Sequence, residues 1–449
     1  MTAQRLPFAA LFAALFAALF VSSASASLPA QDTLQLGALQ AAAVARDPRS
    51  AQPSLLRGQS SLRLTSLDME RRPQLSLNGV ASHQSDVTAV TLNLPGASVP
   101  APPKDRWQAT LDAQQLVYDG GLVSAREELE RARLAESSAA VDAALYRLRA
   151  DVNTAFFSAY LLQERTHEFD ALLGDLEARL QVARARVLAG TALSRDTSAI
   201  VAEQLRSELA RDEATSARGA SLAVLGRLAG RPIDASAVLL LPDLSREVQQ
   251  AQSEGRVESL RIRPEFAQFD RTRARLDREA ASARLANRPR VVAFGQAGFG
   301  RPGLNQFRTD PDEFWQAGLR VEWRPWTWGS ADRSAEVIHA QQRIVTTEER
   351  ALADQLARAV ESDLADMQRL RSALETDSRV VALRTDIEQQ AGAQFTESAI
   401  SAAEYVETRT DVLESRLTLQ RHRAELSQAQ ARYLTTIGLA PRASAGATP

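Results

Sequence analysis

The chain has 449 residues, no cysteine and a net charge of −2. The lack of cysteine excludes disulfides, thiolate metal sites and cysteine catalysis, and the balanced charge gives no indication of a nucleic-acid partner. Aromatic residues make up only 5% of the chain, whereas Ala, Leu, Arg, Glu and Gln are abundant. This mixture favours long helices over a thick globular core.

The N-terminus has the three parts of a secretory signal peptide. Arg5 supplies the positive charge, Leu6 to Val21 form a continuous apolar run, and Ala24-Ser25-Ala26 gives the small-residue cleavage pattern. The apolar run is short for a stable membrane span. We therefore expect residues 1–26 to be a cleaved signal, with an uncleaved anchor as the alternative.

The rest of the chain is predicted to contain one unit twice. Arg72-Pro73 recurs 216 residues later as Arg288-Pro289, and Trp107-Gln108-Ala109 recurs 208 residues later as Trp315-Gln316-Ala317. The change of offset falls at Asn93–Pro103, a proline-rich stretch that is typical of a surface loop. We expect a first copy at 27–230, a linker at 231–257, a second copy at 258–438 and a flexible tail at 439–449.

Each copy is expected to run helix, strand, loop, strand, long helix, turn, long helix. The strands are predicted at about 73–82 and 107–118, and again at about 289–299 and 314–324. In the last strand, apolar residues from Trp315 to Trp323 alternate with polar or small residues from Gln316 to Arg324. Alternation with a period of two predicts a strand with one apolar and one polar face.

All five tryptophans lie in or beside these strands, at Trp107, Trp315, Trp323, Trp326 and Trp328. Tryptophan prefers the boundary between membrane and water, and a polar second face suits a water-filled lumen. These features favour a membrane barrel wall over a strand of a soluble sheet, which shows the same alternation. Four strands are too few to close a barrel with a usable lumen, so several chains are expected to contribute to one barrel.

Long helical hairpins are predicted at about 122–230, with a tip near 190, and at about 330–438, with a tip near 398. Residues 124–189 contain no proline, and their apolar residues recur at three- and four-residue steps, as in Val141, Leu145 and Leu148. A helix of about 65 residues is on the order of 100 Å long and needs partners along its length. The predicted fold class is therefore mainly α with a small membrane β part.

These motifs, in this order, resemble those of the TolC family of outer-membrane channels. The resemblance rests on the Arg-Pro pair before the first strand of each copy, on the strand end Leu116-Val117-Tyr118-Asp119-Gly120-Gly121, and on the turn at 188–196, where a glycine precedes an acidic residue by six positions. The second copy departs from the pattern, with Pro325-Trp326-Thr327-Trp328-Gly329 at the strand end.

The resemblance implies a homotrimer. Three chains of four strands would form a twelve-stranded β-barrel in the outer membrane, and their helices would continue it as a tunnel (an α-barrel) across the periplasm. The implied function is a passive exit duct of a tripartite efflux pump or a type I secretion system, with a periplasmic adaptor and an inner-membrane transporter as partners. The transporter would select the substrate and supply the energy.

The resemblance also implies that the hairpin tips form the periplasmic entrance. Acidic residues there, which would form rings in a threefold assembly and favour cations, are Asp196, Glu404 and Glu407. Phe395 and Ile400 occupy positions where some members carry a tyrosine and an arginine, so we expect closure to depend on apolar packing. The expected contacts for adaptor and pump are Gly190, Thr191, Ser398 and Ala399. The alternative is that all these residues are ordinary solvated acids and turn residues.

We expect no catalysis, no cofactor and no metal site. The four histidines, His83, His167, His339 and His422, are far apart in sequence, and neither a nucleophile elbow nor a Walker loop is present. Two other hypotheses stay open. A periplasmic adaptor would carry one hairpin between small β-domains, and a secreted coiled-coil structural protein would need no detergent.

Overall fold

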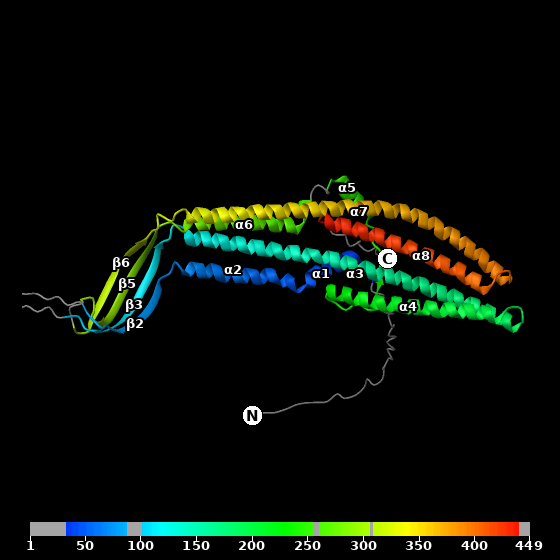
Figure 1. The fold of residues 1–449 in the computed structure, drawn as a ribbon, viewed down its shortest axis with the longest axis horizontal. Helices are drawn as coiled ribbons and strands as arrows, with labels where there is room; N and C mark the ends of the chain where they lie inside the picture. Colours follow the sequence, from blue (N-terminus) through cyan, green and yellow to red (C-terminus); the bar gives the residue numbers. More distant parts are fainter. Residues whose placement is uncertain (1–32, 88–100, 256–259, 306–308, 440–449) are drawn as a thin grey trace, which may run out of the picture.

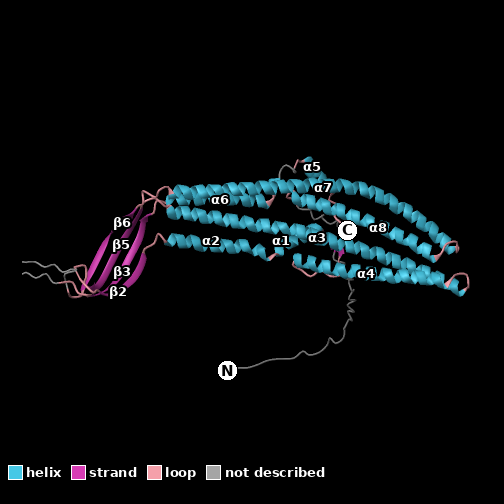
Figure 2. Ribbon diagram, viewed as in Figure 1, coloured by secondary structure: helices cyan, strands magenta, loops and turns pink. Residues whose placement is uncertain are grey.

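The computed structural model describes residues 33–87, 101–255, 260–305 and 309–439. The predicted signal peptide, most of the proline-rich loop and nearly all of the tail lie outside these ranges. The described residues form an elongated body, with a sheet at one end and two helical hairpin tips at the other (Figure 1). Figure 2 shows that helices make up nearly all of the body between these ends.

The sheet contains four strands, one in each range where the sequence predicts a strand. They are β2 (Gln74–His83), β3 (Asp105–Tyr118), β5 (Arg290–Arg301) and β6 (Asp312–Glu322), and each end lies within two residues of the predicted one. Their order is β2-β3-β5-β6, and every neighbouring pair is antiparallel. The two copies therefore meet in the middle of the sheet, between β3 and β5, while β2 and β6 form its edges.

The two copies place their elements at constant offsets. Helices α3 (Leu122–Leu188) and α7 (Ser330–Thr396) have 67 residues each, and their first residues are 208 apart. Helices α4 (Ser194–Leu228) and α8 (Ala402–Thr436) have 35 residues each, again 208 apart. In the sheet, Gln74 pairs with Gln114. The residue 216 positions after Gln74 is Arg290, and the residue 208 positions after Gln114 is Glu322. These two residues also pair. A duplicated unit with one longer loop predicts this correspondence.

Each long helix follows its strand through two left-handed residues. In the first copy these are Gly120 and Gly121, with φ of 69° and 88°. The Asp119 carboxylate accepts hydrogen bonds from the N–H groups of Gly121 (2.8 Å) and Val123 (2.6 Å), which caps α3.

In the second copy the left-handed residues are Trp328 and Gly329, with φ of 54° and 74°. Positive φ is an unfavourable conformation for a bulky side chain such as that of Trp328, because its Cβ crowds the backbone.

A 3₁₀ turn lies beside a proline at the first helix of each copy. In the first copy α1 (Leu36–Arg46) and α2 (Gln52–Met69) are separated by a 3₁₀ turn at Pro48–Ala51. Asp47 is extended, with φ −61° and ψ 133°, because a residue before proline avoids the helical region. In the second copy a 3₁₀ turn at Leu260–Ile262 precedes α6 (Pro264–Leu285).

The predicted linker contains regular structure. Its strand β4 (Val238–Leu239) pairs in parallel with β1 (Thr33–Leu34), and its helix α5 (Ser245–Ser253) lies against α8. Strands of two residues are too short to show alternation, so β1 and β4 were not predicted.

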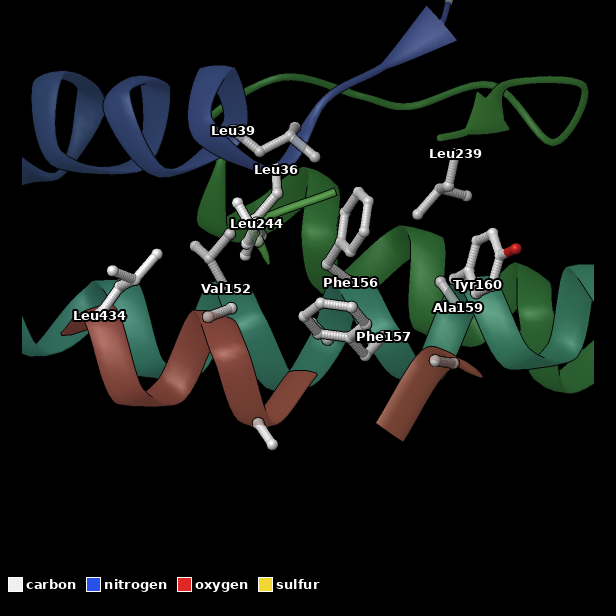
Figure 3. Packing of buried hydrophobic residues seen from close by; sticks show 14 of the residues in the cluster. Leu36, Leu39, Val152, Phe156, Phe157, Ala159, Tyr160, Leu239, Leu244 and Leu434 are labelled. Carbon is white, nitrogen blue, oxygen red and sulfur yellow. The ribbon is translucent and has the colours of Figure 1, made fainter. Parts of the chain in front are cut away.

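The largest apolar cluster lies where this linker crosses the hairpins (Figure 3). Phe156 and Phe157 of α3 are almost completely buried there, together with Leu36 and Leu39 of α1 and Leu434 of α8. Burying each such side chain stabilises the fold by about 1.5–3 kcal/mol. The cluster therefore holds the two hairpins together about midway along the body.

No helix in the described ranges is both long enough and apolar enough to span a membrane.

Candidate functional site: the hairpin tips

The two hairpin tips have the same backbone geometry. In the first, the N–H of Thr191 donates to the carbonyl of Arg186 (3.0 Å), and Gly190 has φ 73°. In the second, the N–H of Ala399 donates to the carbonyl of Gln394 (2.8 Å), and Ser398 has φ 62°. Left-handed residues of this kind end a helix and satisfy its last carbonyls. Ser398 therefore holds the glycine-type conformation of Gly190 despite its side chain.

Each return helix begins with a cap that involves an acidic side chain, and the cap of α8 is reciprocal. At α8, the Ser401 hydroxyl accepts the N–H of Glu404 (3.3 Å), and the Glu404 carboxylate accepts the N–H of Ser401 (2.8 Å). These hydrogen bonds hold the pKa of Glu404 below its usual value. At α4, the Asp196 carboxylate accepts the N–H of Leu193 (3.2 Å). Two of the three predicted entrance acids, Asp196 and Glu404, are therefore also capping residues.

A cleft of about 270 Å³ separates the two tips. Seven of the nine predicted tip residues line it: Thr191, Asp196, Phe395, Ser398, Ala399, Ile400 and Glu404. Gly190 is exposed at the first turn, and Glu407 is exposed on α8 one helical turn after Glu404. Residues from two copies, about 200 positions apart in sequence, thus meet around one opening.

Arg186 of the first hairpin forms hydrogen bonds with the C-terminal end of α7 in the second hairpin. Its Nη1 donates to the carbonyl of Phe395 (2.6 Å), and its Nη2 donates to the carbonyl of Thr396. The guanidinium also lies over the Phe395 ring, 5.5 Å from the ring centroid. A cation at the C-terminus of a helix is favourable, because the last carbonyls carry partial negative charge.

Tyr405 forms a second connection between the hairpins. Its hydroxyl donates to Asp175 Oδ2 (2.7 Å) and accepts from Arg179 Nε (3.1 Å), and both partners lie on α3. Glu388 Oε1 of α7 lies 3.3 Å from the same hydroxyl, and Arg409 Nε donates to Asp175 Oδ2 (3.3 Å). Burial and the neighbouring Asp175 carboxylate raise the pKa of Tyr405, so it stays protonated at all physiological pH values.

The Phe395 side chain lies inside the chain's own core. It is 4% exposed and stacks on the Tyr405 ring, with centroids 5.3 Å apart. Ile400 is half-buried and packs against the same apolar cluster. Both side chains thus hold the two hairpins of one chain against each other. The polar contacts of Tyr405 and Arg186 surround this apolar pair, and sequence reasoning did not find them.

At the opposite end of the molecule, the sheet separates apolar and polar residues by face. Leu77, Leu111, Ala297 and Trp315 are paired in one row across the four strands. The adjacent row, which points to the other face, is Ser76, Asp112, Gln296 and Gln316.

The polar row is hydrogen-bonded, and the large side chains of the apolar row are exposed. Gln296 Nε2 donates to Asp112 Oδ1 (2.5 Å), and Gln316 Nε2 donates to Gln296 Oε1 (2.6 Å). Leu77, Leu111 and Trp315 of the apolar row are all exposed in the single chain.

The tryptophans mark both ends of this sheet. Trp107 and Trp315 belong to the half away from the helices, where Trp107 packs edge-on against Phe299 at 5.5 Å. Trp323, Trp326 and Trp328 follow β6 at the helical end, and all three are exposed. Among the residues that the structure describes, no group of three or more His, Asp or Glu side chains could hold a metal ion.

No protein-family model matches the chain, and no curated protein matches it in sequence. Its structure resembles solved outer-membrane proteins. The crystal structure of CusC, from work on transmembrane channel formation, has a TM-score of 0.67 and 15% identity, over 90% of this chain and 92% of CusC. The chain has the fold of an outer-membrane channel.

Two further structures support this assignment of the outer-membrane channel fold. The outer membrane protein VceC of Vibrio cholerae has a TM-score of 0.64 and 14% identity, over 91% of this chain and 97% of VceC. The open state of the MtrE outer membrane channel of Neisseria gonorrhoeae has a TM-score of 0.64 and 17% identity, over 91% of this chain and 89% of MtrE. The predicted fold class, long helical hairpins with a small β part, is confirmed.

Proposed function

We propose that this chain is the outer-membrane exit duct of a tripartite export system. It would conduct substrates passively from an inner-membrane transporter across the periplasm and the outer membrane. This proposal rests mainly on one observation: a sheet with one exposed apolar face and one polar face is attached to two long helical hairpins. An exposed apolar face that crosses four strands needs a partner. A lipid bilayer suits strands in which apolar and polar residues alternate.

The tryptophans support this placement of the sheet in the membrane. Trp315 and Trp323 lie eight residues apart along one strand direction, which is about 26 Å along the strand and roughly 20 Å along the axis of a barrel whose strands tilt by about 35–45°. The apolar band of an outer-membrane barrel is about 25 Å tall and is flanked by aromatic residues on both sides. The helices would then extend into the periplasm, because α3 alone, with 67 residues, is about 100 Å long.

The edges of the sheet support an assembly of several chains. A strand edge carries unpaired N–H and C=O groups, and lipid offers them no hydrogen bond. We therefore propose that β6 of one chain pairs with β2 of another, and that three chains close a twelve-stranded barrel. The antiparallel order β2-β3-β5-β6 permits this closure, because β6 and a following β2 would again run in opposite directions.

The tips would form the entrance and the docking surface for the other components. Gly190, Thr191, Ser398 and Ala399 are exposed at the turns, as contacts for a periplasmic adaptor and a pump require. We propose that the contacts of Tyr405 and Arg186 hold the two hairpins together in the closed state. This assignment adds polar contacts to the apolar packing of Phe395 and Ile400.

The test of the proposed function is single-channel recording from the purified protein in planar lipid bilayers. Discrete, voltage-stable conductance steps are expected, with an amplitude that rises when the tips are loosened. Protein that stays in solution without detergent and gives no steps would support an adaptor or a secreted coiled-coil protein instead.

Neutralising Glu404 and Glu407, two exposed acids of α8, is expected to reduce cation preference. In Glu404→Gln/Glu407→Gln, each chain loses two negative charges at the entrance, so the ratio of cation to anion permeability should fall several-fold. Reversal potentials under a salt gradient measure this ratio. Glu247→Gln on α5, which removes a charge far from the tips, should leave the ratio unchanged. An equal change in both variants would contradict the placement of the acids at the entrance.

A further inference from the structure

The polar face of the sheet carries two isolated charges of opposite sign, Asp112 and Arg320. Asp112 pairs with Gln296 of β5. Arg320 pairs with Val292, four residues earlier on the same strand, and an even separation places both positions on one face. The other charged residues of this face lie at the ends of the described strands, with one of each sign at each end: Arg290 and Glu322 at the helical end, Arg106 and Asp312 at the other end.

Hydrogen bonds hold the Asp112 carboxylate against the sheet. Its Oδ2 accepts from Asn78 Nδ2 (2.7 Å) and Thr110 Oγ1 (2.8 Å), and its Oδ1 accepts from Gln296 Nε2 (2.5 Å). These donors belong to three strands, so the sheet itself sets the position of the carboxylate. All three donors are neutral, and they therefore fix the carboxylate without compensating its negative charge.

An aromatic ring holds the Arg320 side chain. The guanidinium lies over the Phe294 ring, with Cζ 5.2 Å from the ring centroid. The ring lies across Gly318, where a Cβ would be only 3.0 Å from Phe294 Cζ. Arg320 is exposed, and a neutral ring does not compensate its positive charge as a carboxylate would.

The two charges come from equivalent positions of the two copies but lie at different heights. Arg320 follows Asp112 by 208 residues. Through their partners on β5, Arg320 lies four residues closer to the helices than Asp112. Four residues are about 13 Å along a strand and roughly 10 Å along the axis of a barrel with tilted strands. The Debye length is also about 10 Å at about 0.1 M salt, so each charge acts on its own section of the lumen.

We propose that these residues form two charged rings on the wall of the duct, and that the rings make the current depend on the sign of the voltage. The Arg320 ring lies nearer the periplasm, and the Asp112 ring lies nearer the cell exterior. This inference rests on the multi-chain barrel of the proposed function and adds a property of its lumen. Carboxylate rings gather cations, and rings of arginine gather anions.

The order of the rings determines which voltage carries more current. When the exterior is positive, cations enter through the carboxylate ring and anions enter through the guanidinium ring, so both collect in the section between the rings. When the exterior is negative, both kinds of ion leave that section and deplete it. The conductance is therefore expected to be higher when the exterior is positive.

Current–voltage curves of single channels at about 0.1 M salt test this expectation. Protein added to one side of a planar bilayer inserts in one orientation, because the polar helical body does not cross lipid. Asp112→Asn and Arg320→Gln are each expected to bring the ratio of the currents at opposite voltages closer to one. Asp105→Asn is the matched control, since it removes a carboxylate from the same strand on the other face, and it should leave the ratio unchanged.

Reversal potentials under a salt gradient separate the two rings. Asp112→Asn leaves only the guanidinium ring between the ends of the sheet, so the ratio of cation to anion permeability should fall. Arg320→Gln leaves only the carboxylate ring, so the same ratio should rise. Both shifts should shrink at about 1 M salt, where the Debye length is about 3 Å.

The outcomes distinguish this inference from the proposed function. Channels that conduct, but whose current ratio and reversal potential stay the same in both variants, would overturn the inference alone. Shifts of the reversal potential in the same direction in both variants would also overturn it, because opposite charges must act oppositely. If Asp112→Asn did not assemble, the upward shift in Arg320→Gln would still decide. Unsubstituted protein that forms no channels would overturn the proposed function as well.

Discussion

A Tyr405→Phe variant is expected to conduct more current through a planar bilayer than the unsubstituted channel. The change removes only the hydroxyl, so the ring keeps its stacking on Phe395. Arg179 loses its hydrogen bond to the second hairpin, and Asp175 keeps only the one from Arg409 there. Loss of such a contact costs about 1–3 kcal/mol, which would shift a balance between closed and open tips by roughly 5- to 150-fold.

Tyr433→Phe is the matched control for this experiment. Tyr433 lies on the same helix and is fully buried, but its hydroxyl has no hydrogen-bond partner in the described structure. Its removal should leave conductance and stability nearly unchanged. If Tyr405→Phe behaved like Tyr433→Phe, closure would depend on apolar packing alone. Phe395→Ala and Ile400→Ala would then be the variants that raise conductance.

A Leu111→Arg substitution is expected to prevent stable insertion in the outer membrane. Leu111 lies near the middle of β3 on the apolar face and is 51% exposed. Arginine at the bilayer midplane of a barrel costs about 2–4 kcal/mol, and each chain of the assembly would add that cost. The amount of heat-modifiable multimer in purified outer membranes measures the effect.

Gln114→Arg introduces the same side chain three residues away, on the polar face. In the proposed assembly this face lines a water-filled lumen, so the variant should insert normally and change only the conductance or its ion preference. Equal loss of both variants from the membrane would contradict the assignment of the two faces. Normal insertion of Leu111→Arg would contradict contact between this face and lipid.

The elements of the fold could be predicted because their signals are local. Alternation from Trp315 to Trp323 defines β6, and the constant offset of 208 extends the assignment of one hairpin to the other. The strand inside the predicted linker was not predicted, because β4 has only two residues and pairs with β1, about 200 residues earlier. The left-handed conformation of Trp328 could have been predicted, because the offset of 208 makes Trp328 the equivalent of Gly120.

The tip residues were predicted in part. The turn positions and the capping acids follow from spacing, and most of them line one cleft. The Tyr405 contacts could not be predicted, because Asp175 lies 230 residues earlier in the chain. A single sequence gives no indication of which side chains meet across that separation. The burial of Phe395 likewise depends on Tyr405 and Arg186, which reach it only in the folded chain.

Lys104 provides the most direct test of the orientation that the proposed function requires. It is the only lysine in the chain, is exposed, and directly precedes β3 at the end of the sheet away from the helices. Intact cells would be treated with an amine-reactive polymer too large to cross the outer membrane. The account predicts that Lys104 is labelled, and that Lys104→Arg abolishes the signal. Labelling that appears only after the outer membrane is disrupted would contradict a sheet that spans it.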